Sequence, residues 1–177
     1  MLDLRDGPPL TRLSLRGDAT VAQRAGAAFG VMPPMQPCQT ATEGARTALW
    51  LGPDEWLLLA PHDATPSHDT LTAALNTALA NLPHSLVDVS DGTTTLLVSG
   101  PPAELALRAG CPLDLHPSAF PPGMATRTVL ARIGIILWRA TPAAWHIEVA
   151  PSLTAYAKSF LVEAARGTPA SGLVVDR

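Results

Sequence analysis

Residues 48–61 read ALWLGPDEWLLLAP and contain two short apolar runs separated by the turn sequence GPDE. Proline presets φ at a turn corner and aspartate accepts local backbone hydrogen bonds, so the segment predicts a hairpin of two strands. A general acid/base pair needs both carboxylates directed at one substrate, which adjacency at a turn does not supply. We therefore interpret Asp54 and Glu55 as turn residues, and expect Trp50 and Trp56 to face each other, or a partner, across the hairpin.

The segments around this hairpin predict an α+β unit. Leucines at 71, 75, 79 and 82 recur at helical spacing, and Asp18 and Ser67 are placed to cap the two helices. The expected order is strand, helix, proline-rich loop, hairpin, helix and strand: 11–17, 19–30, 31–44, 46–51 with 55–60, 67–82 and 84–90. This order is the β-α-β-β-α-β pattern of a ferredoxin-like unit.

A second series of elements follows directly. We expect a strand, a short helix, a proline-rich loop, a hairpin turning at Gly134 or one bent strand, another strand and a last helix: 93–100, 101–110, 111–123, 127–133 with 135–140, 144–149 and 152–166. The last helix is expected to present Leu153, Tyr156, Phe160 and Ala164 on one face. No tight sequence repeat relates the halves, which predict two ferredoxin-like-type α+β lobes, 1–90 and 91–177, in one compact unit.

The composition narrows the class of protein. Of 177 residues, 47% are hydrophobic and 15% are charged, against roughly 25% charged residues in ordinary domains. Either part of the surface is covered by another chain, or a surface rich in threonine, proline and alanine gives the same count. A net charge of -3 gives no reason to expect nucleic acid or an anionic membrane. Two cysteines and no signal-peptide order favour the cytoplasm, and no apolar run reaches membrane-helix length.

Candidate chemistry is sparse. Asp88 alternates with valines on a strand, and we weigh a hydrogen-bonded strand aspartate against a ligand contact; Asp91 begins a turn. Cys111, Asp114 and His116 share one loop, but they match neither a closed zinc site nor a nucleophile with an orienting group and an oxyanion hole. The other histidines are scattered. There is no glycine-rich phosphate loop and no basic cluster with aromatics, so the residues alone predict a fold without a catalytic constellation.

Four segments together carry a family resemblance. They read ALWLGPDEWLLL, SLVDVSDGTTTLLVSGP, GCPLDLHPSAFPPGMATRT and LWRATPAAWHIEV with the helix after it. The chain from about residue 47 to 165 resembles the gamma subunit of heterotetrameric sarcosine oxidase. The GCPLDLHPSAFPPG run is the most specific of the four, because no general rule of folding demands it.

The resemblance implies a fold related to the folate-binding domain of aminomethyltransferases. It also implies a complex with alpha, beta and delta subunits that oxidises sarcosine to glycine. In such a complex FAD, FMN, NAD, tetrahydrofolate and zinc are held by other subunits, and the gamma chain packs against alpha without a redox cofactor. No catalytic, cofactor or metal residues are carried over to this chain.

Because the resemblance implies no catalytic or cofactor residues in this chain, we expect its functional surface to be an interface with a partner subunit. We expect the loop after residue 110 to contact a partner, through Cys111, Pro112, Leu113, Asp114, His116, Phe120 and Pro121. One alternative is a stand-alone folate-binding or one-carbon-transfer protein of the same fold, with Asp88 as the carboxylate for the pterin ring. A hydrolase that uses Cys111 and His116 is a third reading.

Overall fold

The computed structural model describes residues 1–63 and 66–167, and the described chain forms two five-stranded antiparallel sheets and four helices. The first sheet runs, in spatial order, β3 (Thr40–Glu43), β4 (Arg46–Gly52), β5 (Glu55–Pro61), β2 (Leu10–Arg16) and β6 (Ser85–Asp88). The second runs β1 (Asp3–Asp6), β7 (Thr94–Ser99), β10 (Ala144–Val149), β9 (Ile133–Thr141) and β8 (Ala125–Leu130). The helices are α1 (Ala19–Phe29), α2 (His68–Leu79), α3 (Ala103–Arg108) and α4 (Thr154–Arg166), the last preceded by the turn η1 (Pro151–Leu153). The α+β prediction is confirmed.

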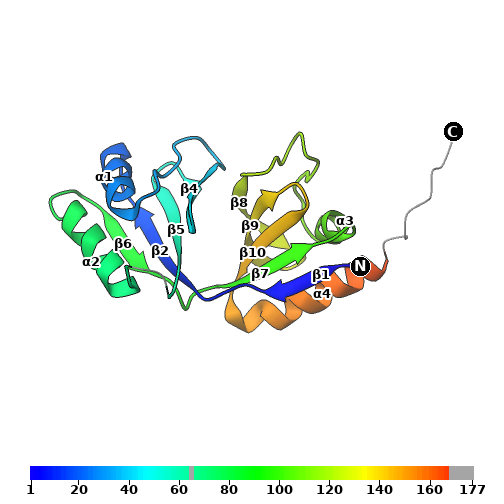
Figure 1. The fold of residues 1–177 in the computed structure, drawn as a ribbon. Helices are drawn as coiled ribbons and strands as arrows, with labels where there is room; N and C mark the ends of the chain where they lie inside the picture. Colours follow the sequence, from blue (N-terminus) through cyan, green and yellow to red (C-terminus); the bar gives the residue numbers. More distant parts are fainter. Residues whose placement is uncertain (64–65, 168–177) are drawn as a thin grey trace.

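The described chain passes twice through one order of elements, ββαβββα, and the two passes exchange their first strands. β1 pairs with β7 in the second sheet, and β6 pairs with β2 in the first. The registers of the two sheets also agree. Leu15 is the partner of Trp56 across β2 and β5, and Val98 is the partner of Trp145 across β7 and β10. Figure 1 shows β1 lying beside β7 in one lobe, while α1 and β4, which come later in the first pass, lie in the other lobe.

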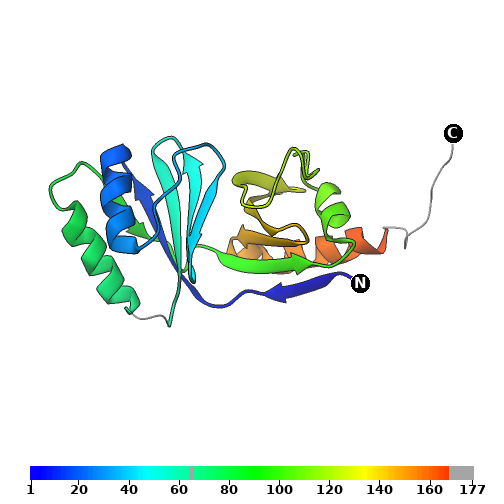
Figure 2. The same cartoon turned by 45° about the horizontal axis from the view of Figure 1, so that its top comes forward.

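Two helices cover the outer face of the first sheet (Figures 1 and 2). Asp18 caps α1 by accepting a hydrogen bond from the Val21 amide, and Gly30 ends the helix in the left-handed conformation, as predicted. Phe29 from α1 and Leu75 from α2 are fully buried against strand residues such as Leu13 and Trp56. Full burial of such side chains contributes about 1.5–3 kcal/mol each.

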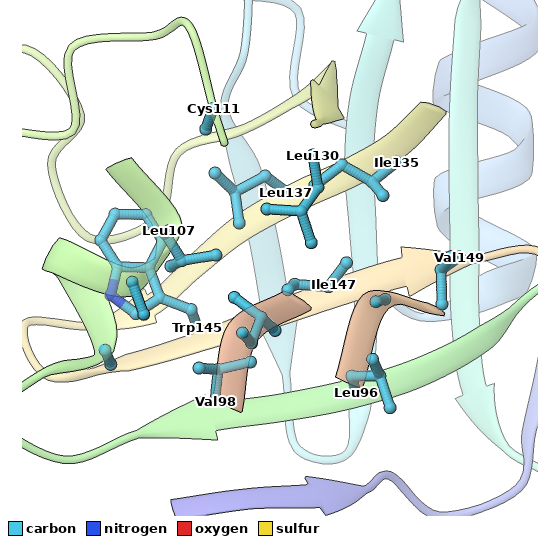
Figure 3. Packing of buried hydrophobic residues seen from close by; sticks show 14 of the residues in the cluster. Leu96, Val98, Leu107, Cys111, Leu130, Ile135, Leu137, Trp145, Ile147 and Val149 are labelled. Carbon is cyan, nitrogen blue, oxygen red and sulfur yellow. The ribbon is translucent and has the colours of Figure 1, made fainter. Parts of the chain in front are cut away.

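The second sheet is covered in the same way by α3 and α4. Figure 3 shows strand residues of this core, including Leu96 and Ile147, and shows Leu107 of α3 beside Trp145. On α4, Ala157 and Leu161 are fully buried. Of the four residues expected on one face of this helix, Leu153, Phe160 and Ala164 pack partly buried against the core, and Tyr156 is 41% exposed.

A buried ion pair joins the two sheets where the chain crosses between them. Arg12 of β2 and Glu148 of β10 are 5% and 4% exposed at their side chains, and Arg12 Nε donates to Glu148 Oε2 at 2.7 Å. Thr93 and Thr95 also donate to the Glu148 carboxylate, and Arg12 Nη2 donates to Thr95 Oγ1 at 2.7 Å. Every charge in this network therefore has a partner, as burial requires.

Backbone hydrogen bonds to Thr95 and Arg12 of the same network fix the ends of the two exchanged strands, β1 and β6. The Gly7 amide, just after β1, donates to Thr95 O at 2.8 Å, and the Val89 amide, just after β6, donates to Arg12 O at 2.9 Å. The Arg12 amide in turn donates a hydrogen bond to Ser90 Oγ at 2.9 Å. The segments that follow β1 and β6 are thus fixed to the interior strands β7 and β2.

Two sequence expectations are corrected, and one strand lies where no element was expected. The first residues are a strand, β1, and the proline-rich loop ends early because Thr40–Glu43 forms β3. Both strands are four residues long and lie at sheet edges, so neither needs a strong apolar alternation. The hairpin turn of the second sheet lies at Ala131, with φ of 53°, and Gly134 lies within β9. The division of the chain at residue 90 stays a prediction.

The buried network yields a stability prediction. Replacing Arg12 with Met leaves the Glu148 carboxylate buried without its counter-ion, which is expected to lower the free energy of unfolding by about 3–5 kcal/mol. The double variant Arg12→Met with Glu148→Leu is expected to recover most of the loss. Urea unfolding followed by circular dichroism measures both.

The control is Arg16→Met, since Arg16 and Asp54 form a half-exposed pair at 3.4 Å. Loss of such a pair costs about 1 kcal/mol or less. An Arg12→Met variant no less stable than Arg16→Met would contradict the role of the buried pair.

Candidate functional site

The two sheets face each other across a cleft of about 500 Å³. Its walls come from both passes of the chain and combine aliphatic side chains with three charged ones. The lining residues are Ser14, Leu51, Glu55, Leu57, Val89, Thr93, Arg127, Thr128, Gly134, Ile135, Ile136, Glu148 and Ala150. Beside the cleft, Leu49, Leu57, Leu59 and Ala125 form a small buried cluster that joins the sheets. The sheets are therefore in contact along one part of their faces and separated along another.

Glu55 and Arg127 form an ion pair across the two sheets at the cleft wall. Arg127 Nη2 lies 2.6 Å from Glu55 Oε1, and Nη1 lies 2.9 Å from Oε2, so the pair is bidentate. The hydrogen bonds and charge of Arg127 hold the pKa of the Glu55 carboxyl below its ordinary value of 4.5, against the opposing effect of burial. Glu55 is therefore ionised at neutral pH and is engaged in joining the sheets.

Asp54 lies at the turn before β5, as predicted, where its carboxylate pairs with Arg16. Trp50 and Trp56 are cross-strand partners, as the hairpin predicted. Trp56 is fully buried and donates from Nε1 to Pro34 O at 2.7 Å. The sequence therefore indicated the turn, but not the long-range partner of its second carboxylate.

Asp88 ends β6 and lies outside the cleft lining. Its Oδ1 accepts bonds from the Ser90 amide at 2.9 Å and the Ser90 hydroxyl at 2.6 Å, and its Oδ2 lies 3.0 Å from His68 Nε2. Burial raises the pKa of the Asp88 carboxyl, but the Ser90 hydrogen bonds and the attraction of His68 and His62 outweigh it and lower the pKa below 3.8. The Asp88 carboxylate therefore fixes the end of β6 to Ser90 and to His68 of α2. A contact between Asp88 and a pterin ring stays a prediction.

His146 on β10 is half-buried and packs against the Trp138 ring, with centroids 4.5 Å apart and an edge-on geometry. Burial lowers the pKa of this imidazole below its ordinary 6.5, and the nearby Glu148 carboxylate offsets only part of that effect. His146 is therefore neutral at pH 7, and its partner is an aromatic ring.

The loop expected to be an interface, residues 111–123, is fixed to the second sheet by Arg139 of β9. Arg139, 2% exposed, donates from Nη1 to Leu115 O and Phe120 O, each at 3.0 Å, and its guanidinium lies 4.6 Å from the Trp145 ring centroid. Of the expected residues, Cys111 and Phe120 are buried and Leu113 is half-buried, while Pro112, Asp114, His116 and Pro121 are exposed. Buried members fix the loop, and exposed members form its surface.

The corresponding loop of the first pass, residues 30–39, lies against this one. Gln39 and Met124 form a β-bridge, the Thr40 amide donates to Gly123 O, and the Ala125 amide donates to Cys38 O. Met32 and Met35 are 54% and 53% exposed on this loop. The two loops together, residues 30–39 and 111–123, are named the loop surface below. Both lie along the upper edge of Figures 1 and 2.

The candidate nucleophile and metal residues are not assembled into a centre. Cys111 is buried, with Thr128 Oγ1 3.7 Å from its Sγ. The His116 side chain bonds Ser118 Oγ, and Asp114 Oδ1 accepts from the His116 amide, as in a local turn. Within residues 1–63 and 66–167, no three histidine, cysteine or acidic side chains are grouped to hold a metal ion. Among the described helices, none is long and apolar enough to cross a membrane.

The fold places the chain in a known class of α+β proteins. It superposes on the glycine cleavage system aminomethyltransferase T from Bartonella henselae with a TM-score of 0.67 and 12% identity, over 93% of this chain and 49% of that one. At this identity the likeness defines the fold alone. It confirms the expected relation to the aminomethyltransferase fold.

The sequence defines the family. Residues 16–167 match the sarcosine oxidase, gamma subunit family, and this chain belongs to that family. It is 42% identical over 116 residues to the sarcosine oxidase subunit gamma of Corynebacterium sp. (strain P-1), a match that covers 66% of this chain and 55% of the relative. A chain of the heterotetrameric sarcosine oxidase from Corynebacterium sp. U-96, solved with pyrrole 2-carboxylate, superposes with a TM-score of 0.86 and 34% identity. That superposition covers 97% of this chain and 87% of the other.

The pair across the cleft yields a pH prediction. The folded-state pKa of Glu55 is lowered, so its stabilisation is present above the ordinary value of 4.5 and is lost as the pH falls through the folded-state pKa. The difference in unfolding free energy between the wild type and Glu55→Gln is expected to be constant near neutral pH and to shrink below 4.5. Its size is under about 1 kcal/mol, since Arg127 is half-exposed.

Urea titrations at a series of pH values measure this difference. Asp54→Asn is the matched control at the neighbouring carboxylate. A Glu55→Gln difference that grows as the pH falls would contradict the assigned pairing.

Proposed function

We propose that this chain is the gamma subunit of a heterotetrameric sarcosine oxidase, and that it contributes structure without catalytic residues. The observation that carries the proposal is the agreement, over 97% of the chain, with a chain of the Corynebacterium complex. Family membership over residues 16–167 supports the same assignment. The activity proposed for the whole complex is oxidation of sarcosine to glycine.

The proposed partners are an alpha, a beta and a delta subunit, with the gamma chain packed against alpha. FAD, FMN, NAD, tetrahydrofolate and zinc are proposed to lie on those other subunits. The low content of charged residues, 15%, supports a surface that is partly covered by another chain. The ion pairs Arg12–Glu148 and Glu55–Arg127 support a non-catalytic role, because each of them joins the two sheets of this chain.

The proposed contact region is the loop surface, including Pro112, Asp114, His116 and Pro121. Its prolines preset φ, and its backbone carbonyls accept hydrogen bonds from the side chains of Arg139 and Trp56. A surface that is already ordered loses little conformational entropy on binding. Exposed methionines such as Met32 and Met35 provide adaptable apolar contacts at protein interfaces.

Co-purification tests the assignment. A tagged copy of this chain, expressed in its native host, is expected to elute with three further subunits in equal amounts and with a yellow flavin absorbance. Recovery of the tagged chain alone and colourless would contradict the proposal.

A matched pair of substitutions tests the contact region. Ala119→Arg places a charge on the loop surface, and Ala73→Arg places the same charge on the exposed side of α2. The first is expected to weaken assembly at least about tenfold, and the second is expected to leave it within about twofold. Affinity is measured by titrating the isolated gamma chain into the remaining complex. Equal effects of the two substitutions would overturn the proposed contact region.

A further inference from the structure

We infer that the cleft between the two sheets is a binding site for a small, uncharged and mainly apolar molecule. The inference is independent of the proposed subunit role, because the cleft is formed by this chain alone. Its volume of about 500 Å³ falls within the roughly 300–1,000 Å³ of ordinary small-molecule sites.

The space exists because small residues occupy positions that a larger side chain would fill. Facing sheets normally interdigitate their side chains into a core with few voids. Here β2 presents Ser14 and β9 presents Gly134 to the cleft. A Cβ atom placed at Gly134 would meet no other atom within 4 Å. The sheets are held at this separation by the Arg12–Glu148 network and the Glu55–Arg127 pair.

The charges of the lining determine the class of ligand. Glu55 and Arg127 neutralise each other, and Glu148 is neutralised by Arg12 directly behind the wall. A charged ligand would enter the cleft without a counter-ion and would lose its hydration, which is unfavourable. An uncharged ligand avoids that loss.

The remaining lining favours an apolar body. Leu51, Leu57, Val89 and Ile136 supply aliphatic walls from both sheets. The hydroxyls of Ser14 and Thr93 lie among them and provide a few hydrogen-bonding groups. This mixture of aliphatic walls and a small number of polar groups is typical of small-molecule sites.

The experiment uses the full chain and the uncharged naphthalene dye Prodan. We expect saturable binding at one site with a blue-shifted emission. Gly134→Phe, which fills the cleft, is expected to weaken binding at least about tenfold, while the matched Gly134→Ala changes it by less than about twofold. Ser14→Leu fills the cleft from the opposite sheet and replaces Gly134→Phe if that variant does not fold. The anionic dye anilinonaphthalene sulfonate is expected to bind this site more weakly than Prodan.

Three outcomes would overturn the inference. In the first, the filling variants bind Prodan as the wild type does. In the second, Met32→Gln with Met35→Gln abolishes binding, which would place the dye on the loop surface. In the third, the filling variants block assembly with the other subunits and assembly itself displaces Prodan, which would make a partner side chain the occupant. Since the dye titration needs no other subunit, its failure is distinguishable from failure of the subunit assignment.

Discussion

The ion pair between Arg12 and Glu148 links two sheets whose strands come from both ends of the chain. Arg12 lies on β2, an interior strand of the first sheet, and Glu148 lies on β10 of the second sheet, 136 residues later. Around them, the Gly7 and Val89 amides bond the segments that follow β1 and β6 to the interior strands β7 and β2. The free energy of a buried charge is favourable only with its partner in place, so the network requires both sheets in one relative position. The cleft and the loop surface both follow from that position.

The exchange of first strands places the chain segments after β1 and β6 next to this network. Each pass of the chain supplies four strands and two helices to its own sheet, and completes it with one short strand from the other pass. Each exchanged strand ends in an aspartate that pairs with a helix of the host lobe: Asp6 with Lys158 of α4, and Asp88 with His68 of α2. The carboxylate that the sequence presented as a ligand candidate is thus one of two equivalent strand-end residues.

Local patterns in the sequence predicted most helices and central strands, because capping residues and apolar periodicity act over a few residues. Asp18 and Gly30 bounded α1, and the leucines of α2 gave its buried face. Short edge strands carry little of that signal, so β1 and β3 were missed. The turn at Ala131 was missed because a left-handed alanine is unusual, and the nearby Gly134 offered a more common turn residue.

The repeated order of elements and the site both depend on strand pairings and contacts that no local pattern contains. Matching positions carry different residues, such as Arg12 and Thr95, so the repeat is visible in strand order and register more than in sequence. Likewise, Glu55 was recognisable as a turn residue, but its partner Arg127 is 72 positions away. Family resemblance supplied the subunit assignment, whereas the cleft became apparent only when the two sheets were seen together.

Native-state hydrogen exchange at Gly7 and Val89 tests the central claim most directly. Their amides donate from the segments after β1 and β6 to β7 and β2, so these segments belong to the cooperative core. Both amides are predicted to exchange only through global unfolding, with the same free energy of opening as the central amides of β2 and β7. Exchange of either amide through a low-energy local opening, while those central amides stay protected, would contradict the account.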